Sequence, residues 1–385
     1  MIRYKLQLTA LAAVVAMATS ACNGGSAVPS ASSVTGSGMT PYSARGASPD
    51  DSTSILKKLT KDVVIGSTVD PTNGDMGPRG LSLVKTNYGL KKGQLAVCNF
   101  EDSTGTAGNG TTIEILGPQT GSKPTTFVQS SQIQGCADDV VNNSNGICAT
   151  GMTSGLLVCF NNKGKVQKTY GSPFQVPFYD VDASCPAKSS FCGYAAEYIF
   201  GSDAKTGSIV NFSINLYGNP KETQVATGFA LNHQSGWSAL GPSGLSYYPK
   251  KDTLYIADGV DNTIVGFNNA SELLVTNEIT VLKGGKKFNC KYPSTTCGTL
   301  VRAGAPLAHP VAMTMLWNGN LIVANTKGAT TLVELTPTGK ILDKKVIDSS
   351  KPAGVFGLLA KGSSDSNTVL YYTDTNDNSV HELEP

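Results

Sequence analysis

A stretch of 24 residues, GLSYYPKKDTLYIADGVDNTIVGF at positions 244–267, restricts the fold of this chain more than any other segment. It alternates three short apolar runs with two polar turns, at 249–253 and 258–262. Apolar runs of this length, separated by Pro, Asp, Gly and Asn, predict strands joined by tight turns. The segment therefore predicts a three-stranded antiparallel meander.

Weaker copies of this meander recur along the chain. Each copy has a Pro or Gly before its first strand, and its second strand often ends in Asp or Asn. We expect the first strands near 76–85, 136–141, 177–184, 244–248, 310–315 and 353–360. The copies are about 55 residues apart on average, and periods of about 40–50 residues are typical of propeller blades. The repeat predicts an all-β fold, a six-bladed β-propeller with Cys-containing insertions.

The two ends of the propeller region complete one another. The sixth copy lacks a fourth strand, because the chain stops after a strand expected at 379–384. A strand expected at 61–69 belongs to no copy. Joining the two completes the last blade, closes the ring and removes exposed sheet edges. In the fourth copy, we expect 277–282 to form the outer strand.

The composition agrees with this fold and limits the partners. Hydrophobic residues make up 40% of the chain and charged residues 15%, with 42 glycines, a mixture that favours strands and turns. The net charge of +2 argues against nucleic-acid binding, which needs clustered Lys and Arg. We expect a monomer that binds a protein or a small molecule on one face of the propeller.

The N-terminus predicts export. Arg3 and Lys5 precede an apolar run over 6–18, which is short for a membrane span and typical of a signal peptide. The following ATSAC at 18–22 resembles the lipobox of bacterial lipoproteins, in which Cys22 would be lipidated, although Thr19 stands where that motif has an aliphatic residue. Ordinary signal-peptidase cleavage in this stretch is the alternative.

Three regions follow from these patterns. Residues 1–22 form the signal peptide, and 23–57, rich in Ser, Gly, Ala and Pro, predict a disordered tether. Residues 58–385 form the propeller. Because Asn23 rather than Asp follows Cys22, the lipoprotein resemblance implies the periplasmic side of the outer membrane or the cell surface. The membrane is contacted through the lipid anchor only.

The chain has nine cysteines, and if Cys22 carries lipid the other eight can form four disulfides in an oxidising compartment. We expect Cys185–Cys192 and Cys290–Cys297, because each pair closes a short loop. The other four cysteines allow three connectivities. Of these we favour Cys136–Cys148, on neighbouring predicted strands, which leaves Cys98–Cys159.

The segments LYIADGVDNTIVGF and NLIVANTKGATTLVELTPTGKIL resemble NHL repeats, and the order of segments over 60–385 is similar to that of uncharacterised exported bacterial proteins with NHL-type six-bladed propellers. This resemblance implies the fold and not an activity, because such propellers include binding scaffolds and some enzymes. A gluconolactonase-type relative would need Glu, Asn and Asp on the inner strands to hold a divalent metal.

Candidate site residues are few. In the inner-strand segments LSLV, FYDVD, LSYY, VAMTM and VFGLL, Asp180 and Asp182 are the only acidic residues. His309 precedes one of these strands at the channel mouth. The Asp374–Asn378 segment begins like a calcium loop, but Ser379 replaces the required Gly, so we interpret it as a hairpin. We therefore predict no metal, no cofactor and no catalytic residue.

The sequence favours a non-catalytic binding or interaction module over an enzyme. The alternative is a lactonase- or lyase-like enzyme that acts on a small molecule at the central channel. A structural cell-envelope protein is a second alternative.

Overall fold

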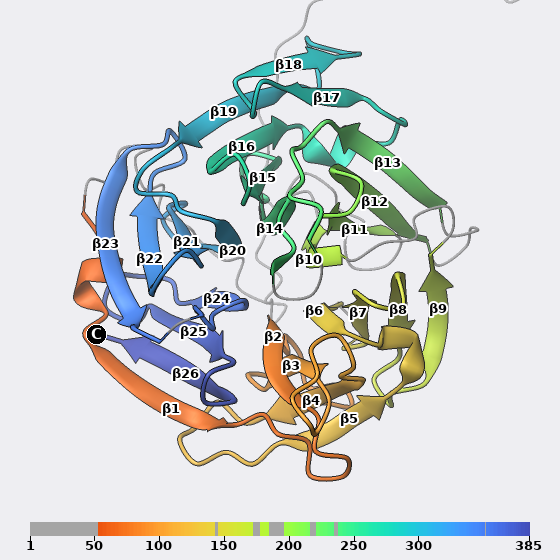
Figure 1. Cartoon of the computed structure of the whole chain (residues 1–385), viewed down its shortest axis with the longest axis vertical. Helices are drawn as coiled ribbons and strands as arrows, with labels where there is room; N and C mark the ends of the chain where they lie inside the picture. Colours follow the sequence, from red (N-terminus) through yellow and green to blue (C-terminus); the bar gives the residue numbers. More distant parts are fainter. Residues whose placement is uncertain are drawn as a thin grey trace, which may run out of the picture. The chain divides into compact units, whose positions relative to one another are not determined.

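The computed structural model describes residues 53–142, 145–171, 178–184, 196–215, 221–234, 238–350 and 352–385, all within one compact unit, Ala44–Pro385. Their strands form six sheets that surround a central axis like the blades of a propeller (Figure 1). The predicted all-β six-bladed propeller is confirmed. Within the described residues, no helix has the length and apolar character needed to cross a membrane.

Each blade runs from an inner strand at the axis to an outer strand at the rim. Blade one contains β2 (Met76–Leu83), β3 (Leu95–Glu101), β4 (Thr112–Leu116) and β5 (Thr125–Gln129). Blade two contains β6 (Cys136–Val141), β7 (Ile147–Gly151), β8 (Leu156–Phe160) and β9 (Val166–Tyr170). Blade three contains β10 (Phe178–Ser184), β11 (Ala196–Asp203), β12 (Ser208–Asn215) and β13 (Lys221–Thr227).

The second half of the ring repeats this order. Blade four contains β14 (Pro242–Tyr248), β15 (Thr253–Asp258), β16 (Thr263–Asn268) and β19 (Gly298–Ala303). Blade five contains β20 (Pro310–Met315), β21 (Leu321–Asn325), β22 (Thr330–Leu335) and β23 (Ile341–Asp348). Blade six contains β24 (Leu358–Lys361), β25 (Val369–Asp374), β26 (Ser379–Glu384) and β1 (Lys61–Ser67).

Blade six closes the ring as the sequence predicts. The N-terminal strand β1 pairs antiparallel with the C-terminal strand β26, from Lys61 opposite Glu384 to Ser67 opposite Ser379. The two ends of the propeller region therefore lie in one sheet (Figure 1). With β1 as its outer strand, blade six has four strands, like the sheets of blades one, two, four and five.

The prediction that 277–282 forms the outer strand of blade four is wrong. That segment, β17 (Ile279–Leu282), pairs in parallel with β13 and forms a hairpin with β18 (Lys287–Cys290), which extends the sheet of blade three. The outer strand of blade four is β19. The Phe288 ring packs edge-on near Phe267 at a centroid distance of 6.4 Å, so the hairpin also covers part of the blade-four core.

Strand periodicity divides the side chains between two inter-blade cores. On β3, Ala96 and Cys98 belong to the cluster shared with blade two. The alternate residues Leu95 and Val97 belong to the cluster shared with blade six. Because successive strand residues point to opposite faces, a blade buried on both sides needs apolar residues at nearly every position, and all but the last residue of β3 are buried.

Three disulfides are described, and they change the expected pairing. Cys290–Cys297 is confirmed, but Cys136–Cys148 and Cys98–Cys159 are wrong, because the bonds are Cys98–Cys136 and Cys148–Cys159. Cys148 and Cys159 lie directly opposite one another on β7 and β8, with Cα atoms 3.9 Å apart. Cys136 pairs instead with Gly151 and meets Cys98 across the interface between blades one and two. Cys22, Cys185 and Cys192 lie outside the described residues.

The packed part of the chain begins before the position expected for the end of the tether. Ile55, Leu56 and Leu59 are fully buried in the core between blades five and six. The buried Glu334 on β22 accepts hydrogen bonds from the Leu56 N–H (2.8 Å) and the Ser54 hydroxyl (2.7 Å). Residues 53–57, assigned to the tether from composition, are therefore held against the propeller by two apolar side chains and one carboxylate.

Candidate functional site

The inner strands approach each other closely around the axis. In five of the six blades, the pairing of the inner strand with the second strand shifts in register near the start of the inner strand. A Cβ atom on Gly80 would lie 2.6 Å from Asp138 Cα in the next blade, and one on Gly357 would lie 2.3 Å from the Arg79 carbonyl oxygen. Glycine is required at both places because the neighbouring atoms belong to the backbone and cannot move aside.

A buried cation lies at this constriction. The Arg79 side chain is 1% exposed, and its guanidinium carbon lies 4.3 Å from the Phe100 ring centroid and 4.2 Å from that of Phe356. Cation–π contacts of this kind stabilise a desolvated guanidinium. Phe356 lines both a cavity along the inner strands and a pocket near the channel mouth. The stack therefore separates two hollow regions of the propeller.

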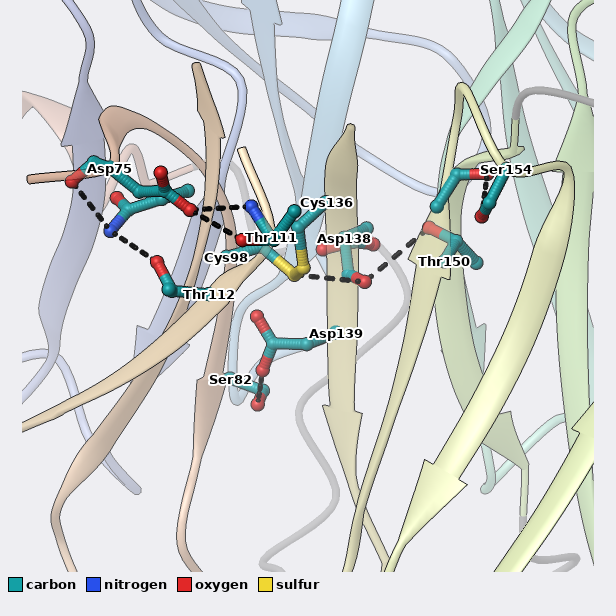
Figure 2. Close-up of a disulfide and its surroundings, with 12 residues drawn as sticks. Asp75, Ser82, Cys98, Thr111, Thr112, Cys136, Asp138, Asp139, Thr150 and Ser154 are labelled. Carbon is teal, nitrogen blue, oxygen red and sulfur yellow. Dashed lines mark hydrogen bonds between the residues drawn. A yellow bond between two sulfur atoms is a disulfide. The ribbon is translucent and has the colours of Figure 1, made fainter. Parts of the chain in front are cut away.

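The cavity along the inner strands has a volume of about 260 Å³. One wall carries Asp139, which is 2% exposed and accepts a hydrogen bond from the Ser82 hydroxyl (Figure 2). Its Oδ1 atom has no hydrogen-bond partner. Burial, together with the neighbouring Asp138 carboxylate, raises the pKa of Asp139 well above its usual range, which favours the protonated form of this group.

Two pockets open on what we call the upper face, the side where the chain passes into the inner strands. The starts of the inner strands and the turns between second and third strands meet on this side, because neighbouring strands are antiparallel. One pocket, of about 570 Å³, has an apolar floor that includes Phe100 and Met152, with His233 at its wall. The other, of about 490 Å³, includes His309. Gln234 lines both pockets, so they adjoin.

The walls of the His309 pocket carry mostly hydrogen-bonding side chains. They come from loops of several blades and include Asn232, Thr326 and Asn376, with Phe356 as an apolar surface at the base. Amides and hydroxyls both donate and accept hydrogen bonds. Such a lining suits a polar ligand that presents donors and acceptors to several blades at once.

His309 has an unusual backbone conformation with a clear structural parallel. Its φ is 51°, and its N–H donates to Asn262 Oδ1 at 2.6 Å. Gly77 occupies the same position before blade one, with φ 69° and an N–H that donates to Asn378 Oδ1 at 2.8 Å. The conformation thus belongs to the junction between blades. A non-glycine residue there costs about 1 kcal/mol, so His309 pays a conformational cost that the glycine does not.

The His309 ring is suited to hydrogen bonding in its neutral form. Burial, and to a lesser extent the positive charge of Lys327, lowers the pKa of His309 below its usual value. The ring is therefore neutral at pH 7, with one nitrogen free to accept a proton or a hydrogen bond.

A second histidine lies in a charged group that joins the two chain ends. His381 on β26 contacts Asp62 Oδ1 through Nδ1 at 3.1 Å and Asp377 Oδ2 through Nε2 at 2.9 Å. The Tyr372 hydroxyl donates to Asp62 at 2.6 Å, and its ring stacks on His381 at 4.8 Å. We call these four residues the closing clasp.

Two members of the closing clasp also belong to a possible metal-binding group. Among the described residues, one set of three His, Cys, Asp or Glu side chains has all its ligand atoms within 4.8 Å of one another, and it consists of Asp374, Asp377 and His381. The blade-four turn repeats its acidic residues as Asp258 and Asp261. Asp258 Oδ1 accepts two backbone N–H bonds there, as Asp374 Oδ1 accepts one from Asn376. The Asp374–Asn378 segment is therefore the hairpin turn that the sequence predicts.

The sequence identified part of this arrangement. It placed His309 at the channel mouth, where the structure has it in a pocket wall. Asp180 and Asp182 fall on β10, but their side chains lie outside the described part of the structure. Arg79 and Asp139 were missed, although charged residues within a buried inner strand, Arg79 on β2 and the Asp138–Asp139 pair on β6, are a signal that the sequence does contain.

Comparisons with known proteins agree with the fold. No family model and no curated protein matches the chain. Among solved structures, it is similar to a luciferin-regenerating enzyme (TM-score 0.52, 11% identity, covering 84% of this chain and 95% of that one). It is also similar to a gluconolactonase from Xanthomonas campestris (TM-score 0.53, 11% identity, 84% and 91% covered). A virginiamycin B lyase from Staphylococcus aureus is matched at TM-score 0.49, 14% identity, 84% and 98% covered. The first two likenesses show that the chain is a six-bladed β-propeller.

Proposed function

We propose that this protein is a binding module that holds a polar small molecule on its upper face, in the pocket that contains His309. The observation that carries the proposal is the conformation of His309. The same junction in blade one is made with Gly77, so the backbone does not need a histidine there. A strained residue that lines a pocket is a common sign of a functional role.

The surroundings of His309 support a polar ligand. The pocket of about 490 Å³ is large enough for a small molecule. Its amide, hydroxyl and imidazole groups come from separate blades, so a ligand bound by several of them would be held rigidly. The adjoining pocket with the Met152 floor could accept an apolar part of the same ligand.

We also propose that the protein is exported and anchored through lipid on Cys22, on the periplasmic side of the outer membrane or on the cell surface. The signal-like N-terminus and the disulfides support an oxidising compartment. A Cys22→Ala variant is expected to move from the membrane fraction to the soluble fraction. Unchanged membrane association would contradict lipid anchoring.

The binding function can be tested by thermal-shift screening with a panel of saccharides, amino acids, nucleosides and small carboxylic acids. A ligand of the upper face should raise the melting temperature of the wild-type protein. The rise should disappear in His309→Gly, which keeps the backbone conformation, and persist in Lys250→Ala, an exposed residue in the turn at the other end of β14. A shift that persists in His309→Gly would refute the proposed pocket.

A lactonase- or lyase-like enzyme is the second candidate, and the lowered pKa of His309 favours it, because a neutral imidazole can act as a general base. The two enzymes with TM-scores above 0.5 show that this fold can carry catalysis in other proteins. Incubation with five- and six-membered lactones, followed by acid release, tests this candidate. Hydrolysis should be abolished in His309→Gly, and hydrolysis that is independent of His309 would exclude this role.

A further inference from the structure

A group of buried polar side chains lies beneath the loop that joins the closing strand β1 to blade one. Asp70 comes from this loop and is 2% exposed, while Asn99 on β3 and Glu114 on β4 are fully buried. Val97 lies opposite Glu114 in the β3–β4 pairing, and Asn99 is two residues further along the same strand. Asn99 and Glu114 therefore project from the same face of the sheet. We call these three residues the buried acidic cluster.

Hydrogen bonds fix two members of the buried acidic cluster. Asp70 Oδ1 accepts the N–H groups of Thr72 (2.7 Å) and Asn73 (2.6 Å), and Oδ2 accepts the Thr126 hydroxyl. The Asn99 amide nitrogen donates to the carbonyl oxygens of Thr68 (2.8 Å) and Asp75 (3.2 Å) and to Thr112 Oγ1 (3.2 Å). Because all three partners accept hydrogen bonds from this atom, it must be the amide nitrogen, and the other atom of the Asn99 amide is the oxygen.

Three oxygen atoms in the cluster have no donor in good hydrogen-bond geometry, although the Glu114 carboxyl lies against the Asp70 carboxyl and the Thr112 hydroxyl. They are both carboxyl oxygens of Glu114 and the amide oxygen of Asn99. The nearby Asp75 carboxylate accepts bonds from the Thr111 N–H (2.6 Å) and hydroxyl (2.9 Å), as Figure 2 shows, and offers no donor. Unpaired buried acceptors are expensive, at about 1–3 kcal/mol each. All the groups in need of a partner are oxygens, and they lie beside a second carboxylate.

A proton alone satisfies only part of this need. Burial, and then the adjacent Asp70, raises the pKa of Glu114 to about 9, so an empty cluster holds a proton on Glu114 at pH 7. That proton can be shared with Asp70, and the Thr112 hydroxyl also reaches Glu114, so the Asn99 oxygen is the acceptor that a proton leaves unpaired. A cation between the adjoining Asp70 and Glu114 carboxyls, on the face of the sheet that also carries Asn99, would offer these oxygens the positive partner that they lack.

We propose that Asp70, Asn99 and Glu114 bind a calcium ion. Two carboxylates and an amide oxygen are the ligands that hard cations prefer, and calcium accepts irregular all-oxygen sets. Magnesium usually keeps several waters, and zinc prefers nitrogen and sulfur ligands. Since Asp70 lies in the loop that follows β1, the ion would fasten the closing strand to blade one and stabilise the closed ring.

Blade five contains a natural control. Glu334 on β22 is also fully buried, but it accepts three hydrogen bonds, from the Ser54 hydroxyl, the Leu56 N–H and the Asn320 amide (2.9 Å). Its carboxylate is satisfied by protein donors and needs no ion. Buried glutamate on a third strand of a blade is therefore not sufficient for the proposed site.

The test measures melting temperature after removal of metals, at pH 7.5, in 1 mM EGTA, 1 mM CaCl₂ or 1 mM MgCl₂. At a calcium concentration well above the dissociation constant, the melting temperature should rise by about 3–5 °C. Magnesium should have little effect. Titration calorimetry should show one calcium ion per chain. A melting temperature that is the same in calcium and EGTA would overturn the proposal and leave a shared proton or a water.

Variants identify the residues. Glu114→Gln should lose the calcium response yet melt in EGTA no lower than the wild type, because the amide supplies donors and is neutral like the protonated Glu114 of the empty cluster. Glu334→Gln should keep the calcium response. Asn99→Asp adds a ligand charge and should enlarge the response, which provides a second readout if Glu114→Gln does not fold. A calcium response that survives in Glu114→Gln, or is unchanged in Asn99→Asp, would overturn the assignment.

Discussion

The closing clasp makes the stability of the ring depend on pH. Burial alone would lower the pKa of His381, but the carboxylates of Asp62 and Asp377 outweigh it and raise the pKa to about 9. In an unfolded chain the value is about 6.5. Because the folded-state pKa is the higher one, the stabilisation is complete below pH 6.5 and is lost as the pH rises through 9.

The size of the effect follows from these two values. The difference between about 9 and about 6.5 corresponds to about 3.4 kcal/mol if all of it is realised. The His381 side chain is 13% exposed, but those of Asp62 and Asp377 are 39% and 48% exposed. Water screens such partners, so we expect about 1–2 kcal/mol.

The assay compares wild type with His381→Gln, which keeps an amide for hydrogen bonding but does not titrate. Urea unfolding at pH 6 and at pH 9.5 gives the free energy of unfolding of both proteins. The advantage of the wild type should shrink by about 1–2 kcal/mol between the two pH values. Other titrating groups are common to both proteins and cancel in the difference. An advantage that stays constant or grows with pH would refute the clasp.

Two further predictions concern the blade interfaces. Replacing Cys98 and Cys136 by Ser should lower the free energy of unfolding by about 4 kcal/mol, because this disulfide closes a loop with a separation of 38 residues. The same change at Cys148 and Cys159, 11 residues apart, should cost about 3 kcal/mol because the loop is shorter. Chemical denaturation measures both costs, and the reverse order would contradict the argument that disulfides act on the unfolded state. Gly80→Ala should cost about 1–3 kcal/mol, because the new methyl lies 2.6 Å from backbone. Gly266→Ala, whose nearest neighbours are side-chain atoms at 3.3 Å or more, should cost less, and equal costs would contradict the packing argument.

The ring and its closure were readable from sequence because they depend on local patterns. Each blade repeats strand and turn signals, and the unpaired strand at 61–69 has one free place to go. The position of β17 was not readable, since four residues of strand sequence do not specify which sheet edge they join. β17 and β19 compete for the edges of blades three and four, and long-range packing decides between them.

The two disulfides differ in whether their pairing follows from the local sequence. Cys148 and Cys159 are equally far from the centre of one hairpin, so their pairing could have been deduced from the turn alone. Cys98 and Cys136 meet only because two blades pack face to face. The upper-face site is similarly non-local: His309 stands out in the sequence, but its likeness to Gly77 appears only when both junctions are compared in space.

The central claim is that His309 is kept for a ligand and not for the fold. The most direct test is the free energy of unfolding of His309→Gly, measured by urea denaturation without ligand. Glycine removes the cost of a positive φ, and after its greater unfolded-state entropy is allowed for, the variant should be more stable by about 0.5–1 kcal/mol. A loss of stability of 1 kcal/mol or more would mean that the His309 ring supports the fold, and would contradict the account.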